Sequence, residues 1–275
     1  MNVRVLGRGD RRMVARLVDA DPVLNVFVAS RLAAGVLERH APGELWGYPG
    51  REFRSLVHVG SNLVPLEADA EASRAFAERM GPHRPFCAIV GLSGQVNGLL
   101  RDLAEIWGDA YGRPRAIRER QPVLATSSEC GVAEDPRVRP VTGADFEAYF
   151  AAAVAMYTEE LEEDPLVTNA YGYRRYVRSL IDSGRAFGIV EDGEVIFKAD
   201  VGAIGNGVAQ VQGVWVAPRL RGKGLAAPAM AAVTNRIVRG GRTASLYVND
   251  FNAPALATYR RCGYTERGVF STVLY

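Results

Sequence analysis

The residues best suited to chemistry lie together near residue 220. Arg219, Arg221 and Lys223 are interleaved with Gly222 and Gly224, between an apolar stretch and an apolar stripe of helical period. Glycines let backbone N–H groups approach an anion closely, and the N-terminus of a following helix adds partial positive charge. The stretch therefore predicts a phosphate-binding loop.

Two common phosphate-binding loops do not fit this spacing. A P-loop needs four residues between its glycines and then Lys-Ser or Lys-Thr, whereas only Lys223 separates Gly222 from Gly224. A dinucleotide-binding loop needs a third glycine, where Ala227 stands, and an acidic residue at the end of a later strand.

The flanking residues predict a strand that enters the loop and a helix that leaves it. The run 211–216 is β-branched or aromatic, and Pro218 ends it because proline cannot donate to a ladder. From Leu225 to Ile237 apolar residues recur at intervals of four, and Gly240 suits the end of the helix. Pro228 lies either in the first turn of this helix or at a kink.

A second pattern follows towards the end of the chain. The run 245–248 predicts a strand, and Asn252 is a good N-cap for a helix over 253–262. Gly263 suits the C-terminal end of that helix, with Tyr264 placed for the accompanying apolar contact. The remaining residues predict two short strands, at 264–268 and 270–275.

Both patterns resemble the GNAT superfamily of N-acyltransferases. The loop is similar to the family's acetyl-CoA pyrophosphate loop, Arg-x-x-Gly-x-Gly. The family's closing pattern is matched at Val248, Asn249, Asn252, Ala255, Tyr259, Gly263 and Tyr264. The ending is also similar to that of mycothiol synthases, which carry a degenerate first domain. The resemblance covers roughly the second half of the chain.

The resemblance implies functional roles for some of these residues and for the strand before the loop. Tyr259 would be the general acid, because a neutral phenol can donate a proton to a leaving thiolate. The pyrophosphate would be held by backbone N–H groups of Arg221, Gly222, Lys223, Gly224, Leu225 and Ala226. The pantetheine arm of acetyl-CoA would lie along Val214, Trp215 and Val216, where a backbone N–H would polarise the thioester carbonyl. Asn252 would reach the cofactor from the other side.

The general base stays open. Several family members carry a Glu on the strand before the loop, but Gln210 and Gln212 stand here, and an amide does not usefully accept a proton. The acidic residues Glu159, Glu160, Glu162, Glu163 and Asp164 lie where the acceptor-binding helices are expected, although such a run most often forms a solvated face. The α-carboxylate of Tyr275 or a chain of water molecules could also serve.

Composition narrows the class of function. The 275 residues carry a net charge of +2 and are 48% hydrophobic, without a basic stretch interleaved with aromatics, so no nucleic-acid partner is expected. No apolar run approaches the roughly 18 residues of a membrane span, and no signal peptide is expected. Cys87, Cys130 and Cys262 are widely spaced, which predicts no disulfide framework, no metal site and a cytoplasmic location.

The first half predicts the same order of elements as the second. We expect strands at 3–6, 53–59, 62–66, 87–90 and 115–125, and helices at 10–17, 22–34, 68–80 and 94–107. Before the loop, the second half predicts strands at 138–141, 186–191 and 194–203 and helices from Asp145 and from about Asn169. The resulting fold class is α/β (α+β), with two tandem GNAT-like domains, each a mixed and mostly antiparallel sheet flanked by helices.

We expect these domains at 1–126 and 136–275, joined by a polar stretch. In the first, the segment 66–71 occupies the place of the loop, with no glycine and three acidic residues that would repel a pyrophosphate. The first domain is therefore expected to be a degenerate copy that serves as a scaffold, or that shapes the acceptor site at the domain interface.

These observations predict an N-acetyltransferase that moves an acetyl group from acetyl-CoA to a small-molecule or peptide amine by direct attack. One alternative is a non-catalytic acyl-CoA-binding sensor or scaffold protein. Another is an aminoacyl-tRNA-dependent transferase, which needs a basic groove that this nearly neutral chain does not suggest. The acceptor, the acyl chain length and the oligomeric state are not set by the sequence.

Overall fold

The structure is a computed structural model that describes residues 2–275. It divides into two compact units, the first of which includes two segments from beyond residue 246. Unit 1 contains the residues up to Val123 together with Tyr247–Asn252 and Glu266–Tyr275, and unit 2 contains Leu124–Leu246 and Ala253–Thr265. No helix within residues 2–275 is long and apolar enough to cross a lipid bilayer.

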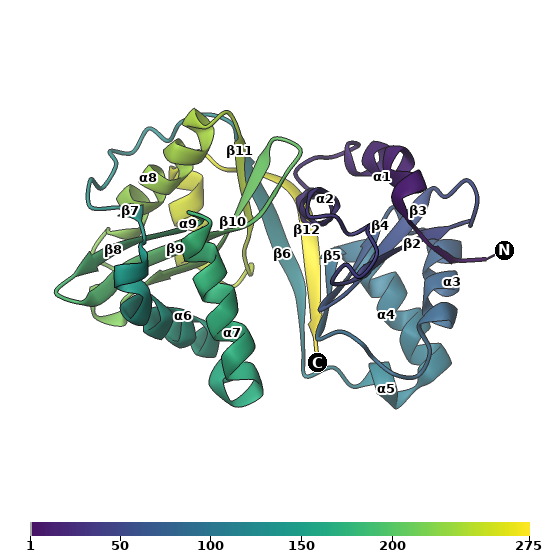
Figure 1. The fold of residues 1–275 in the computed structure, drawn as a ribbon. Coiled ribbons are helices and arrows are strands. Elements are labelled where there is room, and N and C mark those ends of the chain that lie inside the picture. Colours follow the sequence, from purple (N-terminus) through teal and green to yellow (C-terminus); the bar gives the residue numbers. More distant parts are fainter. Residues whose placement is uncertain (1) are drawn as a thin grey trace. The chain divides into compact units, whose positions relative to one another are not determined.

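The two halves of the chain repeat one order of elements, which confirms the predicted repeat (Figure 1). The first half contains β1 (Arg4–Val5), α1 (Arg11–Val18), α2 (Val26–Ala33), β2 (Glu44–Tyr48), β3 (Ser55–Val59), β4 (Asn62–Leu66), α3 (Ala70–Met80), β5 (Ala88–Leu92), α4 (Ser93–Trp107), α5 (Asp109–Gly112) and β6 (Ala116–Thr126). The second contains β7 (Arg139–Pro140), α6 (Phe146–Leu161), α7 (Pro165–Asp182), β8 (Ala186–Glu191), β9 (Glu194–Gly205), β10 (Val208–Val216), α8 (Ala226–Arg239), β11 (Thr243–Tyr247), α9 (Ala253–Arg261) and β12 (Thr265–Leu274).

In unit 1, neighbouring strands follow the order β1-β2-β3-β4-β5-β12. The pairs are antiparallel except β4 with β5, which is parallel. The core on one face of this sheet contains Phe76 of α3, Leu99 and Leu103 of α4, and Val273 of β12, each fully buried. The last strand of the chain thus contributes to the core of the first unit.

This placement of β12 differs from the expected division of the chain. The ranges 1–126 and 136–275 make each domain one continuous stretch, whereas β12 pairs with β5 from Phe270 to Leu274. The prediction of two short strands at 264–268 and 270–275 is wrong, because β12 is a single strand over Thr265–Leu274. The strand continues through Gly268, where Leu24 packs so closely that a Cβ would lie 3.0 Å from Leu24 Cδ2.

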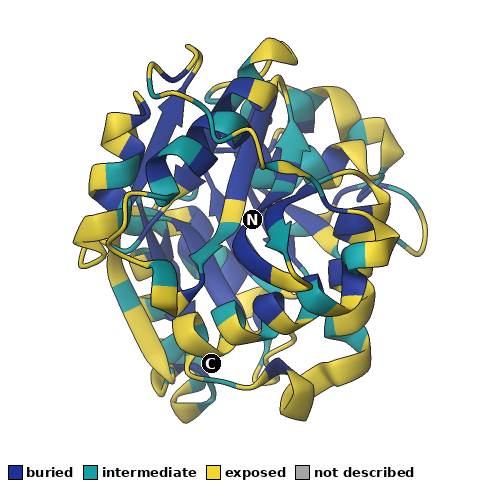
Figure 2. Cartoon of the chain, turned by 90° about the vertical axis from the view of Figure 1, so that its left-hand side faces the viewer, coloured by how far each residue is buried: buried dark blue, intermediate teal, exposed yellow. Residues whose placement is uncertain are grey.

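In unit 2, neighbouring strands follow the order β11-β10-β9-β8-β7. They are antiparallel except β10 with β11, which repeats the parallel pair of unit 1 at the same place in the order of elements. Helices α6 and α7 cover one face of this sheet, and α8 with α9 covers the other (Figure 1). Figure 2 shows the strands largely buried and the outward faces of the helices exposed.

Two elements depart from expectation for local reasons. Strand β2 is not predicted because it is buried from Leu45 to Tyr48 on both faces, so its sequence has no polar alternation. Helix α7 begins at Pro165, where Asp164 caps it, and is interrupted at Asn169, which has φ −160°. The Asn169 side chain accepts a hydrogen bond from the N–H of Gly172 at 2.9 Å, so it caps the longer second part of the helix.

Candidate active site

Strand β10 carries a bulge just before the predicted loop. Gln212 pairs with Asp200 of β9 and Trp215 pairs with Lys198, so Gly213 and Val214 together face the single residue Ala199. Gly213 has φ +58°, the left-handed conformation typical of the first residue in a glycine bulge. Val214, Trp215 and Val216 are predicted to lie along the pantetheine arm. Val214 is the second residue of the bulge, the other two follow it, and all three are half-buried.

Strands β10 and β11 pair over a short stretch only. Their parallel register runs from Val208–Thr243 to Gln210–Ser245 and, within the described residues, does not continue towards the loop. Beyond Gln210 one side of β10 is therefore not paired with β11. Such an edge could accept an added extended ligand through main-chain hydrogen bonds.

The segment predicted to bind phosphate is an exposed loop. A short 3-10 turn, Pro218–Leu220, leads into Arg221–Gly224, all exposed. Gly222 and Gly224 have φ +73° and +77°, with no atom within 4 Å of where a Cβ would stand. The N–H of Arg221 donates to Pro218 O at 3.3 Å, whereas within residues 2–275 the backbone N–H groups from Gly222 to Ala226 donate no hydrogen bond.

The helix after the loop begins without a side-chain cap. Its N-cap is Leu225, which offers no acceptor, and Pro228 lies in the first turn, where its missing N–H costs no intrahelical bond. The matching helix of unit 1, α3, is capped by Asp69, whose side chain accepts from Ala72 N at 2.9 Å. The first unit therefore satisfies its helix terminus with its own carboxylate, and the second leaves this terminus open to an external anion.

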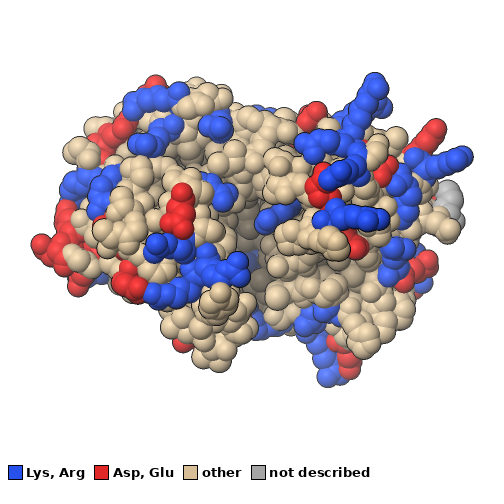
Figure 3. Space-filling view, viewed as in Figure 1, with Lys and Arg blue, Asp and Glu red and all other residues tan. Residues whose placement is uncertain are grey.

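The cations of the loop differ in their partners. The Arg221 guanidinium donates two hydrogen bonds to Glu159 of α6, at 2.6 and 2.7 Å, and a third to Val216 O at 3.0 Å. This ion pair lowers the pKa of Glu159 and raises that of Arg221. Arg219 pairs with Glu194. Figure 3 shows such basic and acidic side chains interspersed over one face of the molecule.

Tyr259 lies in α9 and is 6% exposed. Its ring packs beside Tyr264, with ring centroids 6.0 Å apart. Burial is the main cause that raises the pKa of Tyr259 above 10.0, and the negative charge of Glu160 adds to it. The phenol is therefore held in its neutral, proton-donating form. The structure places Tyr259 and the loop within unit 2 but groups Asn252, which directly precedes α9, with unit 1.

The base candidates are distributed unevenly. Glu159 is engaged by Arg221, while Glu160 is the carboxylate whose charge acts on both Tyr259 and Tyr173. Tyr275 belongs to unit 1, where its ring packs against Phe86 and Tyr111. These contacts therefore do not single out one side chain as the general base.

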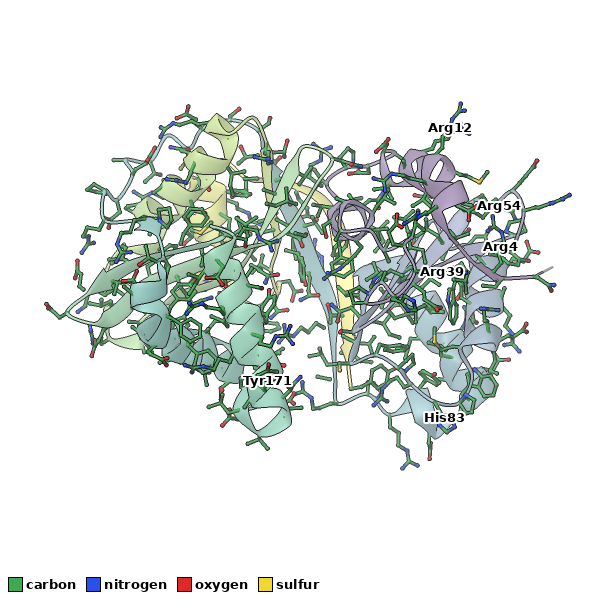
Figure 4. The ribbon with its side chains drawn as sticks, viewed as in Figure 1. Arg4, Arg12, Arg39, Arg54, His83 and Tyr171 are labelled. Carbon is green, nitrogen blue, oxygen red and sulfur yellow. The ribbon has the colours of Figure 1, made fainter. Side chains whose placement is uncertain are left out.

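Aromatic side chains line the α6 and α7 side of β10. Tyr173 contacts Phe150 and Tyr157 through its ring, and Tyr176 accepts a hydrogen bond from Gln212. Tyr171, labelled in Figure 4, projects from α7 and is 74% exposed. Tyr176 links this group of rings to the strand that carries the bulge, because its ring also packs beside Tyr173.

A buried charged cluster beneath the bulge is missing from the sequence-based prediction. Lys198 and Asp200 of β9 form an ion pair at 2.7 Å, and Tyr149 of α6 donates to Asp200 at 2.7 Å. The sequence contained a sign of this ion pair. Lys198 and Asp200 are separated by one residue in the apolar strand 195–201, so they must lie on the same face of the sheet. Their partner on α6 could not be inferred from spacing.

Family models match the two halves separately. Residues 148–264 match the acetyltransferase (GNAT) family, and residues 43–149 match a domain of unknown function, DUF4081. No curated protein matches the sequence.

Solved structures resemble the chain over its whole length. A Drosophila protein is 14% identical with a TM-score of 0.72, covering 99% of this chain and 98% of its own. A GNAT-family acetyltransferase from Colwellia psychrerythraea is 12% identical with a TM-score of 0.61 and full coverage of both chains. A tandem GNAT protein from the clavulanic acid biosynthesis pathway is 15% identical with a TM-score of 0.53, covering 99% of this chain and 98% of its own.

At these identities the structural likeness establishes the fold, which is two tandem GNAT-like domains. The family model adds the identity of the second half. The chain therefore carries, over residues 148–264, a domain of the GNAT acetyltransferase family.

Proposed function

We propose that the protein is an N-acetyltransferase that moves the acetyl group of acetyl-CoA to a primary amine. The observation that carries this proposal is the contrast between the two repeats. Helix α8 begins uncapped behind two left-handed glycines, whereas α3 is closed by Asp69. A pyrophosphate is the ligand whose charge suits the free N–H groups of this loop.

The reaction follows from this placement. Backbone N–H groups of residues 222–226 bind the pyrophosphate, and the pantetheine arm lies along Val214, Trp215 and Val216. The acceptor amine attacks the thioester carbonyl, a C–N bond forms and the C–S bond breaks. Tyr259 gives its proton to the leaving thiolate, a transfer that its buried and neutral phenol favours. The proton that the attacking nitrogen loses passes through water and restores the phenol of Tyr259.

The acceptor in this proposal is a small-molecule or peptide amine, and the location is the cytoplasm. The family model supports acyl transfer in general. The cytoplasmic location is supported by three free cysteines, two of them buried.

Calorimetric titration with acetyl-CoA tests the cofactor and the loop together. Wild type should bind, and a Gly222→Glu, Gly224→Glu variant should lose binding, because two carboxylates would then stand in the anion site. The matched control is Gly207→Glu, Gly241→Glu. These glycines have φ +73° and +74° and equally open surroundings, but they lie beyond the far end of α8. The control should bind like wild type.

Loss of binding in both double variants, or wild-type protein that is folded and does not bind, would refute the proposal. Binding of acetyl-CoA without acetyl transfer to any amine in a broad screen would instead identify a non-catalytic acyl-CoA sensor.

A further inference from the structure

The bulge in β10 has a buried ammonium beneath it. Lys198 is fully buried, and its Nζ donates to Asp200 Oδ2 at 2.7 Å and to the carbonyl oxygen of Gly213 at 2.8 Å. Asp200 Oδ1 accepts from the Tyr149 hydroxyl at 2.7 Å. The cluster therefore links α6, β9 and the first residue of the bulge.

The fit around Gly213 is close. A Cβ on this residue would stand 2.9 Å from Lys198 Nζ, 3.0 Å from Asp200 Oδ2 and 3.2 Å from the Met156 methyl carbon. Its positive φ separately disfavours a side chain. The geometry thus requires glycine where the carbonyl meets the ammonium.

This contact acts on the next residue through the peptide bond. In a planar trans peptide the C=O and N–H point in opposite directions, so fixing the oxygen of Gly213 towards Lys198 aims the N–H of Val214 away from the cluster. A cation that is hydrogen-bonded to a carbonyl also polarises the whole peptide unit. The N–H of Val214 thereby becomes a stronger donor.

We propose that Lys198, paired with Asp200, is a positioning residue that orients and polarises the Gly213–Val214 peptide so that the N–H of Val214 binds the thioester carbonyl of acetyl-CoA. This inference rests on the proposed function, and it names Lys198 as the residue that holds the N–H of Val214 in position. Preorganised donors are effective because they need no reorientation as negative charge develops on the oxygen.

The choice of lysine fits this role. The sequence has 33 basic residues, of which only Lys198 and Lys223 are lysines. The guanidinium of an arginine is larger and planar, whereas the compact ammonium of Lys198 can donate separate hydrogen bonds to Asp200 and to the carbonyl of Gly213.

Infrared spectroscopy of bound acetyl-CoA, labelled with ¹³C at the thioester carbonyl, tests the proposal directly. The carbonyl band of acetyl-CoA bound to the wild type should lie at a lower frequency than that of acetyl-CoA free in water. In a Lys198→Met, Asp200→Asn variant, which removes both buried charges together, the band should return to its solution position. The affinity for free CoA should stay within twofold of wild type, because CoA has no thioester carbonyl. Acetyl transfer to hydroxylamine should fall at least about tenfold in kcat.

Tyr149→Phe is the matched control. It removes a hydrogen bond from Asp200 and lowers the melting temperature, but it leaves the contact between Lys198 and Gly213 in place. Its carbonyl band should therefore stay shifted. A merely structural role would instead give both variants the same band and rates that follow their stabilities, which would overturn the proposal.

A second measurement uses unaltered protein and so does not depend on the folding of a variant. The amide proton resonance of Val214 should move downfield with acetyl-CoA but not with CoA. Equal shifts with both ligands would overturn the inference. Wild type that fails to bind acetyl-CoA would overturn the proposed function and this inference with it, whereas binding with an unshifted carbonyl band would overturn the inference alone.

Discussion

Arg221 donates two hydrogen bonds to the carboxylate of Glu159, Nη1 to Oε1 at 2.6 Å and Nη2 to Oε2 at 2.7 Å. The pair joins the candidate phosphate loop to the last turn of α6. It therefore holds a negative charge next to the place where a second anion is proposed to bind.

Glu159→Gln should tighten acetyl-CoA binding about two- to threefold at low ionic strength, because it removes this charge and leaves a hydrogen-bonding amide. The free energy of unfolding should change by less than about 1 kcal/mol, since the two side chains are 42% and 50% exposed. Titration at two salt concentrations measures both the gain and its screening. Glu129→Gln, which breaks the pair with Arg239 in the last turn of α8, should leave affinity unchanged. Weaker binding by Glu159→Gln would show that the ion pair mainly orders the loop.

Tyr259→Phe should lower kcat about 10- to 100-fold with little change in the KM for acetyl-CoA, because the phenyl ring keeps the packing and loses the proton. Burial raises the pKa of Tyr259, so the acid stays protonated and should cause no loss of rate below about pH 10. Steady-state release of CoA thiol against pH measures both effects.

Tyr264→Phe is the control for that variant. Its hydroxyl lies 3.0 Å from the hydroxyl of Thr234, so its loss should cost about 1 kcal/mol of stability and leave kcat intact. Equal kcat in wild type and Tyr259→Phe would remove Tyr259 from the mechanism.

His58 should make unit 1 sensitive to mild acid. It is 2% exposed, and burial lowers its pKa from 6.5 to about 4. Between pH 6.5 and pH 4 the unfolded chain binds more protons at His58 than the folded chain does. The contribution of neutral His58 to the free energy of unfolding is therefore fully present above pH 6.5, and about 3 kcal/mol of it is lost as the pH drops to 4. Urea unfolding at pH 7, 5 and 4 should show this loss in wild type and a smaller one in His58→Gln. Parallel pH profiles would exclude His58 as the cause.

The three cysteines should differ sharply in reactivity. Cys87 is exposed, whereas Cys130 and Cys262 are buried, and burial together with the neighbouring Cys130 thiol raises the pKa of the Cys262 thiol. Iodoacetamide at pH 8 should alkylate Cys87 in the native protein and the other two only after unfolding, because the thiolate is the reactive form. Peptide mass spectrometry reads each site separately. Native labelling of Cys262 at a rate similar to that of Cys87 would contradict the described burial.

Local pattern was enough to predict the elements around the loop. The strand before it, the helix after it with Pro228 in the first turn, and α9 up to Arg261 are all confirmed. Their signals are short-range, since glycine pairs, caps and apolar periods depend on adjacent residues. The roles of Tyr259 and of the loop residues remain predictions from resemblance.

Long-range partners could not be read in this way. The residues of β12 predict strand, but nothing in them specifies β5 as the neighbour. Lys198 and Asp200 could be placed on one face of a strand, yet Tyr149 lies on a helix far back in the sequence and meets them only through packing. Strand β2 was missed for a local reason. It is covered on both faces, so its sequence lacks the alternation of polar and apolar residues that predicts a strand.

The position of β12 also sets an order of events during synthesis. Val273, which the ribosome adds after all of residues 124–246, is part of the core of unit 1, although most of that unit is made before them. The emerging first unit therefore presents β5 without one of its neighbours while the whole second half is translated. The unit made first completes its core only after the chain has been translated through residue 273.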